Sequence, residues 1–140
     1  MTTSPRTGFI DHQGRAIVLM DFSGITLEDE AMPIIDEARR FVASRPQVRD
    51  LLTLVDATGS RCTGPVIERL KELAKHNGPW VLAGAVVGLN PILRLFLRII
   101  TFVTGRKLAV FRTRDEAQAW LVQQHTPPAS VPEHWAEPAE

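Results

Sequence analysis

Short apolar runs alternate along the chain with segments in which apolar residues recur every three or four positions. Residues 9–12 and 16–21 are rich in strand-forming residues and flank a Gln13-Gly14 turn, a pattern that predicts a β-hairpin. Three later apolar runs predict further strands, the first two of them buried, and lie at residues 51–55, 80–87 and 107–111.

The longest helical pattern begins soon after the hairpin. Apolar residues from Leu27 to Val42 fall on one helical face, and Thr26 with Asp29 resembles a capping box at its start. Pro33 lies inside this pattern and predicts a kink or a late start, because proline removes a backbone donor. We expect one helix here that buries its apolar face.

Three further helical segments separate or follow the later strands. The first opens near Pro65 and ends at Gly78, and the second opens at Pro91 and runs to about residue 104. The last opens at Thr113, where Glu116 completes a capping box. Strands that alternate with helices predict a mostly parallel sheet. The fold class is therefore α/β, with five strands, an antiparallel first strand and about four helices in the order β-β-α-β-α-β-α-β-α.

Length and composition are those of one small globular domain. The chain has 140 residues, of which 44% are hydrophobic and 23% charged, enough for a single core. Residues 1–125 hold all the predicted elements. Residues 126–140 are rich in proline and acidic residues, which predicts a disordered tail that the fold does not need.

The charge balance and the single cysteine limit which binding partners and which cellular compartment the sequence predicts. Basic and acidic side chains number 16 each, so no net positive charge supports strong nucleic-acid binding. The single cysteine, Cys62, and a start without the apolar stretch of a secretory signal predict a cytoplasmic protein. Residues 80–105 are as apolar as a membrane span, but Pro91 interrupts the run, and Arg94 and Arg98 would lie at a costly depth. We expect no transmembrane span.

Polar residues that could carry chemistry gather in the loops that follow the predicted strands. Ligands of open α/β sheets bind outside the carboxyl ends of the strands, where the strand order reverses. Three loops end strands in this way, at residues 21–26, 56–64 and 88–91, and the middle one holds the most polar groups. The candidate interaction loop therefore comprises Asp56, Thr58, Gly59, Ser60 and Arg61.

No catalytic or metal-binding template fits these loops. Gly59 and Gly64 have the spacing of a phosphate-binding loop, but no lysine followed by serine or threonine comes next. Neither Ser23 nor Ser60 has the flanking glycines of a nucleophile elbow. The four histidines are scattered, and Cys62 is interpreted as an ordinary loop residue.

Two aspartates end neighbouring strands and could have formed a catalytic pair. Asp21 and Asp56 stand where aspartate commonly forms a turn or a cap, and we interpret both in that way. The sequence therefore predicts a protein that is not an enzyme and that needs no cofactor or metal.

The helix predicted from Pro91 is apolar over an unusually wide arc. At about 100° per residue its apolar side chains cover roughly 220°, which leaves a narrow stripe of Arg94, Arg98 and Thr101. One core face needs an arc of only about 100° or somewhat more. The surplus predicts cover by neighbouring elements, a second subunit, an apolar ligand or a membrane surface, and Leu97 lies at the edge of the arc beside the arginines.

Several short motifs follow one another at characteristic distances. They are His12-Gln13-Gly14 leading into Asp21-Phe22-Ser23-Gly24, Val55-Asp56-Ala57-Thr58-Gly59, Val86-Val87-Gly88-Leu89, and Thr113-Arg114-Asp115-Glu116-Ala117 before Trp120-Leu121. In this order they resemble the SpoIIAA-like, or STAS/Sec14-type, family of small bacterial proteins over residues 9–122. The resemblance implies a fold shared by anti-sigma-factor antagonists, cytoplasmic domains of sulfate transporters and lipid-carrying Sec14 domains, none of which is an enzyme in its own right.

The resemblance also implies a candidate modification site. In the antagonists an Asp-Ser-Ser-Gly-like turn carries a regulatory phosphoserine, and the turn from Asp56 to Gly59 falls at the corresponding place. Thr58 is therefore the candidate for phosphorylation. Residues 60–64 depart from the pattern, because in the antagonists the helix follows the turn at once.

Two functions stay open after this comparison. One is a regulatory module that binds a protein partner, such as a kinase or another regulator, or a second copy of the chain, through the strand-end loops. The other is a carrier or sensor of an apolar, lipid-like ligand, as in Sec14-type domains.

Overall fold

The elements follow the predicted order in the computed structural model, which describes residues 5–61, 63–89, 91, 94–95, 97–98 and 107–124. Their bounds are β1 Thr7–His12, β2 Arg15–Asp21, α1 Glu28–Ala43, β3 Leu51–Asp56, α2 Gly64–Asn77, β4 Val81–Val87, β5 Leu108–Phe111 and α4 Arg114–Leu121. Of the helix predicted over residues 91–104, the described residues 91, 94–95 and 97–98 are helical, and the rest lies outside the described part. The predicted tail, 126–140, also lies outside it.

All five strands form one sheet in the order β1-β2-β3-β4-β5, antiparallel between β1 and β2 and parallel elsewhere. The hairpin turn places Gln13 at φ 52° and Gly14 at φ 80°, the left-handed pair that suits the twist of a two-residue hairpin. The mixed sheet confirms the predicted fold class. The strand order nevertheless follows the chain without reversal, so the expected switch point is absent from the described sheet.

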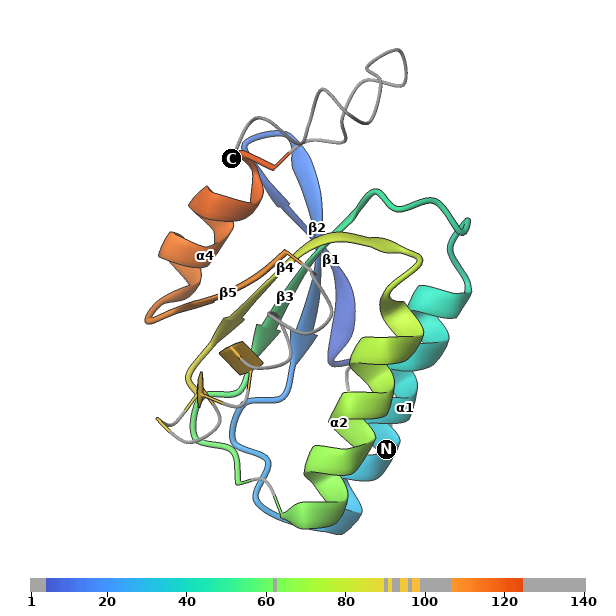
Figure 1. Ribbon diagram of the computed structural model, residues 1–140, viewed down its shortest axis with the longest axis vertical. Helices are drawn as coiled ribbons and strands as arrows, with labels where there is room; N and C mark the ends of the chain where they lie inside the picture. Colours follow the sequence, from blue (N-terminus) through green and yellow to red (C-terminus); the bar gives the residue numbers. More distant parts are fainter. Residues whose placement is uncertain are drawn as a thin grey trace.

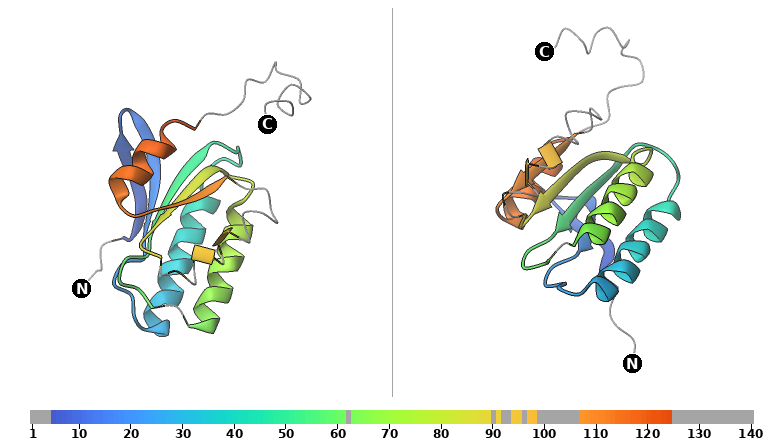
Figure 2. Two further views of the ribbon diagram at one scale, coloured as in Figure 1. Left: turned by 60° about the vertical axis from the view of Figure 1, so that its left-hand side comes forward. Right: turned by 60° about the horizontal axis from the view of Figure 1, so that its bottom comes forward.

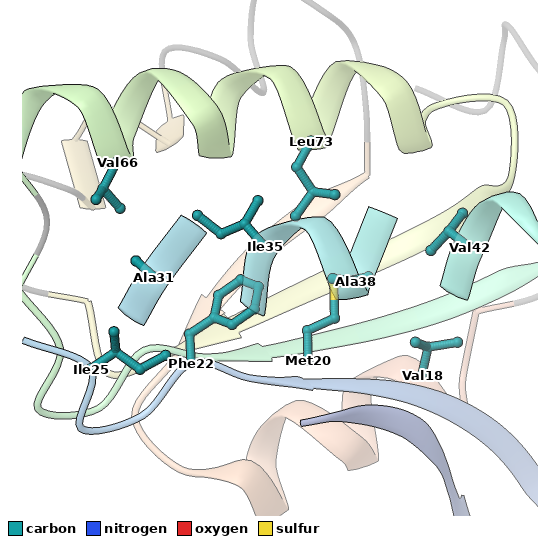
Figure 3. Close-up of a cluster of buried hydrophobic side chains, with 10 residues drawn as sticks. All are labelled: Val18, Met20, Phe22, Ile25, Ala31, Ile35, Ala38, Val42, Val66 and Leu73. Atoms are coloured by element: carbon teal, nitrogen blue, oxygen red, sulfur yellow. The ribbon is translucent and has the colours of Figure 1, made fainter. Parts of the chain in front are cut away.

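Helices cover both faces of the sheet. Figure 1 shows α1 and α2 side by side on one face and α4 on the other, and Figure 2 shows the same layers from two further directions. Strand alternation divides the core accordingly: Val18 and Met20 face α1 and α2, whereas Ile17 faces α4. Figure 3 shows the first cluster, in which side chains of β2, α1 and α2 meet.

One predicted helix cap is wrong and another is confirmed. Thr26 and Asp29 do not form a capping box, because α1 begins at Glu28 with Leu27 as a cap that makes no side-chain hydrogen bond. Leu27 is 61% exposed rather than buried. The helix continues through Pro33 and does not start late. At α4, Thr113 Oγ1 accepts a hydrogen bond from Glu116 N at 3.2 Å, as the sequence predicts.

Candidate functional site

The loops after the parallel strands meet at one rim of the sheet, as parallel strands require. Gly24 N donates to Thr58 O at 2.8 Å, and Phe22 N donates to Asp56 O at 2.8 Å. Ala57 N donates to Val87 O at 2.9 Å, which extends the pairing of β3 with β4. We call the loops at residues 21–27, 57–63 and 88–89 the rim loops, excluding Cys62, which lies outside the described residues.

Two of these loops open with turns of the same design. Asp21 Oδ1 accepts from Ser23 N at 3.0 Å, and Asp56 Oδ1 accepts from Thr58 N at 2.9 Å. Each turn ends in a glycine with positive φ, Gly24 at 69° and Gly59 at 72°. The prediction that both aspartates form turns is confirmed, and the two turns are joined by the hydrogen bonds from Phe22 N to Asp56 O and from Gly24 N to Thr58 O.

Arg114 joins the two aspartates. Its Nε donates to Asp56 Oδ2 at 2.7 Å, and its Nη2 lies 3.7 Å from Asp21 Oδ1. Arg114 is the first residue of α4, which follows β5 and therefore begins at the same rim. The two carboxylates thus share one guanidinium instead of facing each other as a catalytic pair.

Asp56 is the most buried charge of this cluster, with 8% of its side chain exposed. Burial alone raises the pKa of a carboxyl group, because it disfavours the charged form. Hydrogen bonds from the Thr58 side chain and backbone and from Arg114 outweigh that effect, so the pKa of Asp56 lies below its ordinary value of 3.8. Asp56 is therefore a stable anion that holds the turn and not a proton donor or acceptor near neutral pH.

A second arginine holds the Asp21 turn from the other side. Arg6 Nη1 donates to Ser23 O at 3.0 Å and to Asp21 O at 3.2 Å. The Glu37 carboxylate in turn accepts from the backbone N–H groups of Arg6 and Thr7, both at 3.0 Å. The Asp21 turn is thus tied to the start of β1 and to α1.

The candidate interaction loop lies on the outer side of the rim. Thr58, Gly59 and Arg61 are exposed, and Ser60 is half-buried, with Oγ donating to Ala57 O at 2.8 Å. Arg61 N donates to Ile25 O at 2.9 Å, which fixes the loop to the one before α1. The structure therefore places Thr58, Gly59 and Arg61 on one exposed surface, with Asp56 buried beneath it and Ser60 half-buried.

Gly88 approaches this loop very closely. It has φ +82°, and a Cβ added there would lie 2.5 Å from Thr58 N and Oγ1 and 2.6 Å from Thr58 Cα. Real Cβ atoms do not approach other atoms so closely, so Gly88 and Thr58 cannot both keep their positions if residue 88 carries a side chain.

An apolar cavity of about 180 Å³ lies behind the rim, between α2 and the sheet. Apolar residues of α2 and the sheet form most of its wall, and all three rim loops close one end. The rim residues concerned are Phe22, Ile25, Ala57, Ser60, Arg61 and Leu89. The cavity thus touches the inner side of the loops whose outer side carries Thr58.

Leu97 and the two arginines of the predicted contact helix differ in burial. Leu97 is half-buried and lines the cavity. Arg94 and Arg98 are exposed, and Arg94 Nη2 donates to Leu89 O at 3.3 Å. Thr101 lies outside the described residues.

Sequence reasoning missed the two arginines that hold the rim. Arg114 was visible only as the first residue of a predicted helix that follows the last strand, a position that places it at the strand-end rim. No local signal marked Arg6. Among the residues that the structure describes, no group of three or more histidine, cysteine, aspartate or glutamate side chains could hold a metal ion.

Comparison with known proteins identifies the fold. No protein-family model and no curated protein matches the chain. The chain is similar to an uncharacterised DUF3478-family protein with a SpoIIAA-like fold from Shewanella loihica PV-4, at 16% identity and a TM-score of 0.63, over 86% of this chain and 98% of that one. It is also similar to an anti-sigma factor antagonist from Mycobacterium paratuberculosis, at 17% identity and a TM-score of 0.50, over 86% of this chain and 99% of that one.

These likenesses define the class of structure: the chain has the SpoIIAA-like, or STAS-type, fold, as its motifs predict. At such identities they carry the fold and not the activity. Within the described ranges, no helix reaches the length and apolar character needed to cross a membrane.

Proposed function

We propose that this chain is a regulatory, non-enzymatic module that binds a protein partner through the outer side of its rim loops. The observation that carries the proposal is the exposed surface of Thr58, Gly59 and Arg61, held from behind by Asp56 and Arg114. The structural likeness to an anti-sigma factor antagonist supports a regulatory role.

A surface of this kind binds at a low entropic cost, because its backbone is already ordered. Thr58 N and Thr58 O, and Arg61 N, all have hydrogen-bond partners within the fold. A partner that docks here does not have to immobilise a flexible loop, which is the main benefit of preorganisation.

The test compares two exposed arginines at opposite ends of β3. Arg61 follows β3 at the rim, and Arg49 precedes it at the other end of the sheet. We expect Arg61→Glu to remove at least one protein that co-purifies with the tagged chain from its own cells, and Arg49→Glu to retain it. If both variants keep the same set of proteins, the rim is not the docking surface.

Thr58 is the proposed point of control within this surface. Thr58 is an exposed residue whose hydroxyl hydrogen-bonds Asp56, so a phosphoryl group on that hydroxyl replaces the bond with repulsion between two anions. Intact-mass measurement on the chain from its own cells, with Thr58→Val as control, tests this. An added mass of about 80 Da that Thr58→Val abolishes supports the site, and one that survives in Thr58→Val places the modification elsewhere.

A second function, binding of an apolar ligand, is favoured by the cavity. Its volume of about 180 Å³ exceeds the roughly 150 Å³ of an apolar cavity that binds benzene. Native mass spectrometry of the purified chain should show a retained small molecule, and Ala74→Phe, which fills the cavity from α2, should release it. Spectra with only the bare chain mass, before and after incubation with 1-octanol, would contradict ligand binding.

A further inference from the structure

The cavity and the proposed docking surface share a wall. Ala57, Ser60 and Arg61 line the cavity, while Thr58 and Gly59, in the same loop, are exposed and are not part of the lining. Leu89, on the β4 side of the rim, lines the cavity as well. An occupant of the cavity therefore contacts the inner side of the loop that a protein partner would contact from outside.

The rim loops are the part of the cavity wall that lies outside the regular elements. The rest of the lining belongs to the sheet, to α2, to Ala31 and Ile35 of α1, and to Leu97. The rim loops are held by individual hydrogen bonds, such as Ala57 N to Val87 O and Arg61 N to Ile25 O, and not by a continuous ladder. Segments with fewer backbone hydrogen bonds open at a lower free energy than regular elements.

The contact between Gly88 and Thr58 links the cavity wall to the outer turn. Leu89 lines the cavity and is the chain neighbour of Gly88, and the position of a Cβ on Gly88 is already filled by Thr58 atoms. A displacement of Gly88 and Leu89 toward Thr58 therefore presses on the Thr58 turn, which is also paired to β4 through Ala57 N and Val87 O. Close packing transmits small shifts between packed groups in this way.

From this arrangement we infer that an alkyl chain in the cavity changes the conformation of the Thr58 turn and so regulates the docking surface. The inference rests on both proposed functions, because it couples the apolar ligand to the protein partner. A single alkyl chain of about eight carbons is a suitable occupant, because the lining is almost wholly apolar and the chain is larger than benzene, which an apolar cavity of roughly 150 Å³ binds. Such coupling between two sites is reciprocal, so a bound partner also alters the affinity for the alkyl chain.

The test is a titration of the isotope-labelled chain with 1-octanol, followed by amide NMR shifts. Ile67 reports the cavity wall, Thr58 and Gly59 report the outer turn, and Gln118 on α4 is the reference on the far face of the sheet. We expect saturable shifts at Ile67 and Thr58 with dissociation constants that agree within twofold, and none at Gln118. Shifts at Ile67 without shifts at Thr58 and Gly59 overturn the coupling and leave the ligand site standing. The absence of any saturable shift removes both the ligand site and the coupling.

A cavity-filling variant shows whether octanol acts from inside. Ala74 lines the cavity from α2, and Ala74→Phe occupies that space. We expect this variant to lose the shifts at Ile67 and Thr58 together. Shifts at Thr58 that persist in Ala74→Phe mean that octanol reaches the turn from outside, which also overturns the inference. If Ala74→Phe fails to fold, as circular dichroism would show, the titration of the unaltered chain decides alone.

Discussion

The turns at Asp21 and Asp56 have the same local chemistry and different surroundings. Both have an aspartate that accepts from the backbone two residues on, a hydroxyl residue and a glycine with positive φ, and both contact Arg114. The Asp21 side chain is 32% exposed and lies 3.7 Å from the guanidinium, whereas Asp56 is 8% exposed and bonds it at 2.7 Å. The same sequence signature thus gives one turn whose aspartate is half-exposed and one whose aspartate is buried, and only the second carries the proposed docking surface.

Removal of each carboxylate should show the largest difference between the turns. Asp56→Ala leaves Arg114 and Thr58 N without their buried acceptor, and we expect it to lower the free energy of unfolding by about 3 kcal/mol. Asp21→Ala removes a half-exposed partner and should cost about 1 kcal/mol or less. Chemical denaturation of both variants measures the difference, and equal losses would show that burial does not distinguish the turns.

Alanine substitutions at two glycines distinguish the cost of a left-handed backbone conformation from the cost of a steric clash. Gly88→Ala should cost about 2 kcal/mol or more, because it combines a left-handed conformation with a clash against Thr58. Gly24→Ala meets open space at a similar φ and should cost about 1 kcal/mol from the conformation alone. Melting curves compare the two, and amide shifts at Thr58 in Gly88→Ala alone confirm the contact. A Gly24→Ala variant that is as damaging, or that also moves Thr58, contradicts the role given to Gly88.

Arg114→Met should cost less, about 1.5 kcal/mol, because the guanidinium is partly solvated. The more specific effect of this substitution is on the protonation of Asp56. One cause of the lowered pKa of Asp56 disappears, so that pKa should rise in the variant. An NMR titration of the carboxyl carbon reads this directly, and Arg112→Met, which removes a neighbouring exposed arginine, is the control. An unchanged pKa in Arg114→Met would mean that Thr58 alone holds the charge.

The smallest expected effect is on acid stability. The pKa of Asp56 is lower in the folded chain than its ordinary value of 3.8, so its stabilising contribution is complete at neutral pH. That contribution is lost as the pH falls below about 4 and through the folded-state pKa. Asp56→Asn should therefore flatten the decline of the free energy of unfolding in this range relative to the unaltered chain. A decline as steep as that of the unaltered chain would contradict the lowered pKa of Asp56.

Most of the fold could be predicted because most of its elements depend on residues that are adjacent in the sequence. This holds for the Gln13-Gly14 hairpin, for the uninterrupted apolar runs of β3 and β4, and for the Thr113 cap. The cap expected at Thr26 failed for a non-local reason. The loop before α1 is tied to the neighbouring rim loop through Gly24 N and Ile25 O, and Leu27, which is extended, takes the cap position, so the helix starts at Glu28.

The candidate site was only half predictable. Asp56 and Thr58 could be found, because a polar loop after a buried strand is visible in the sequence. Arg114 lies 58 residues from Asp56, and its role depends on α4 starting at the rim and covering the opposite face of the sheet. The cavity depends on the position of α2 relative to the sheet, and the spacing of apolar residues in the sequence does not predict that position.

The most direct test of the docking proposal is site-specific photo-crosslinking in living cells. A photoreactive amino acid replaces Arg61 at the rim in one strain and Arg49, at the other end of β3, in a second strain. The account predicts a covalent adduct with a second protein, or with another copy of this chain, from position 61 and none from position 49. Adducts from position 49 alone, or equal adducts from both positions, would contradict it.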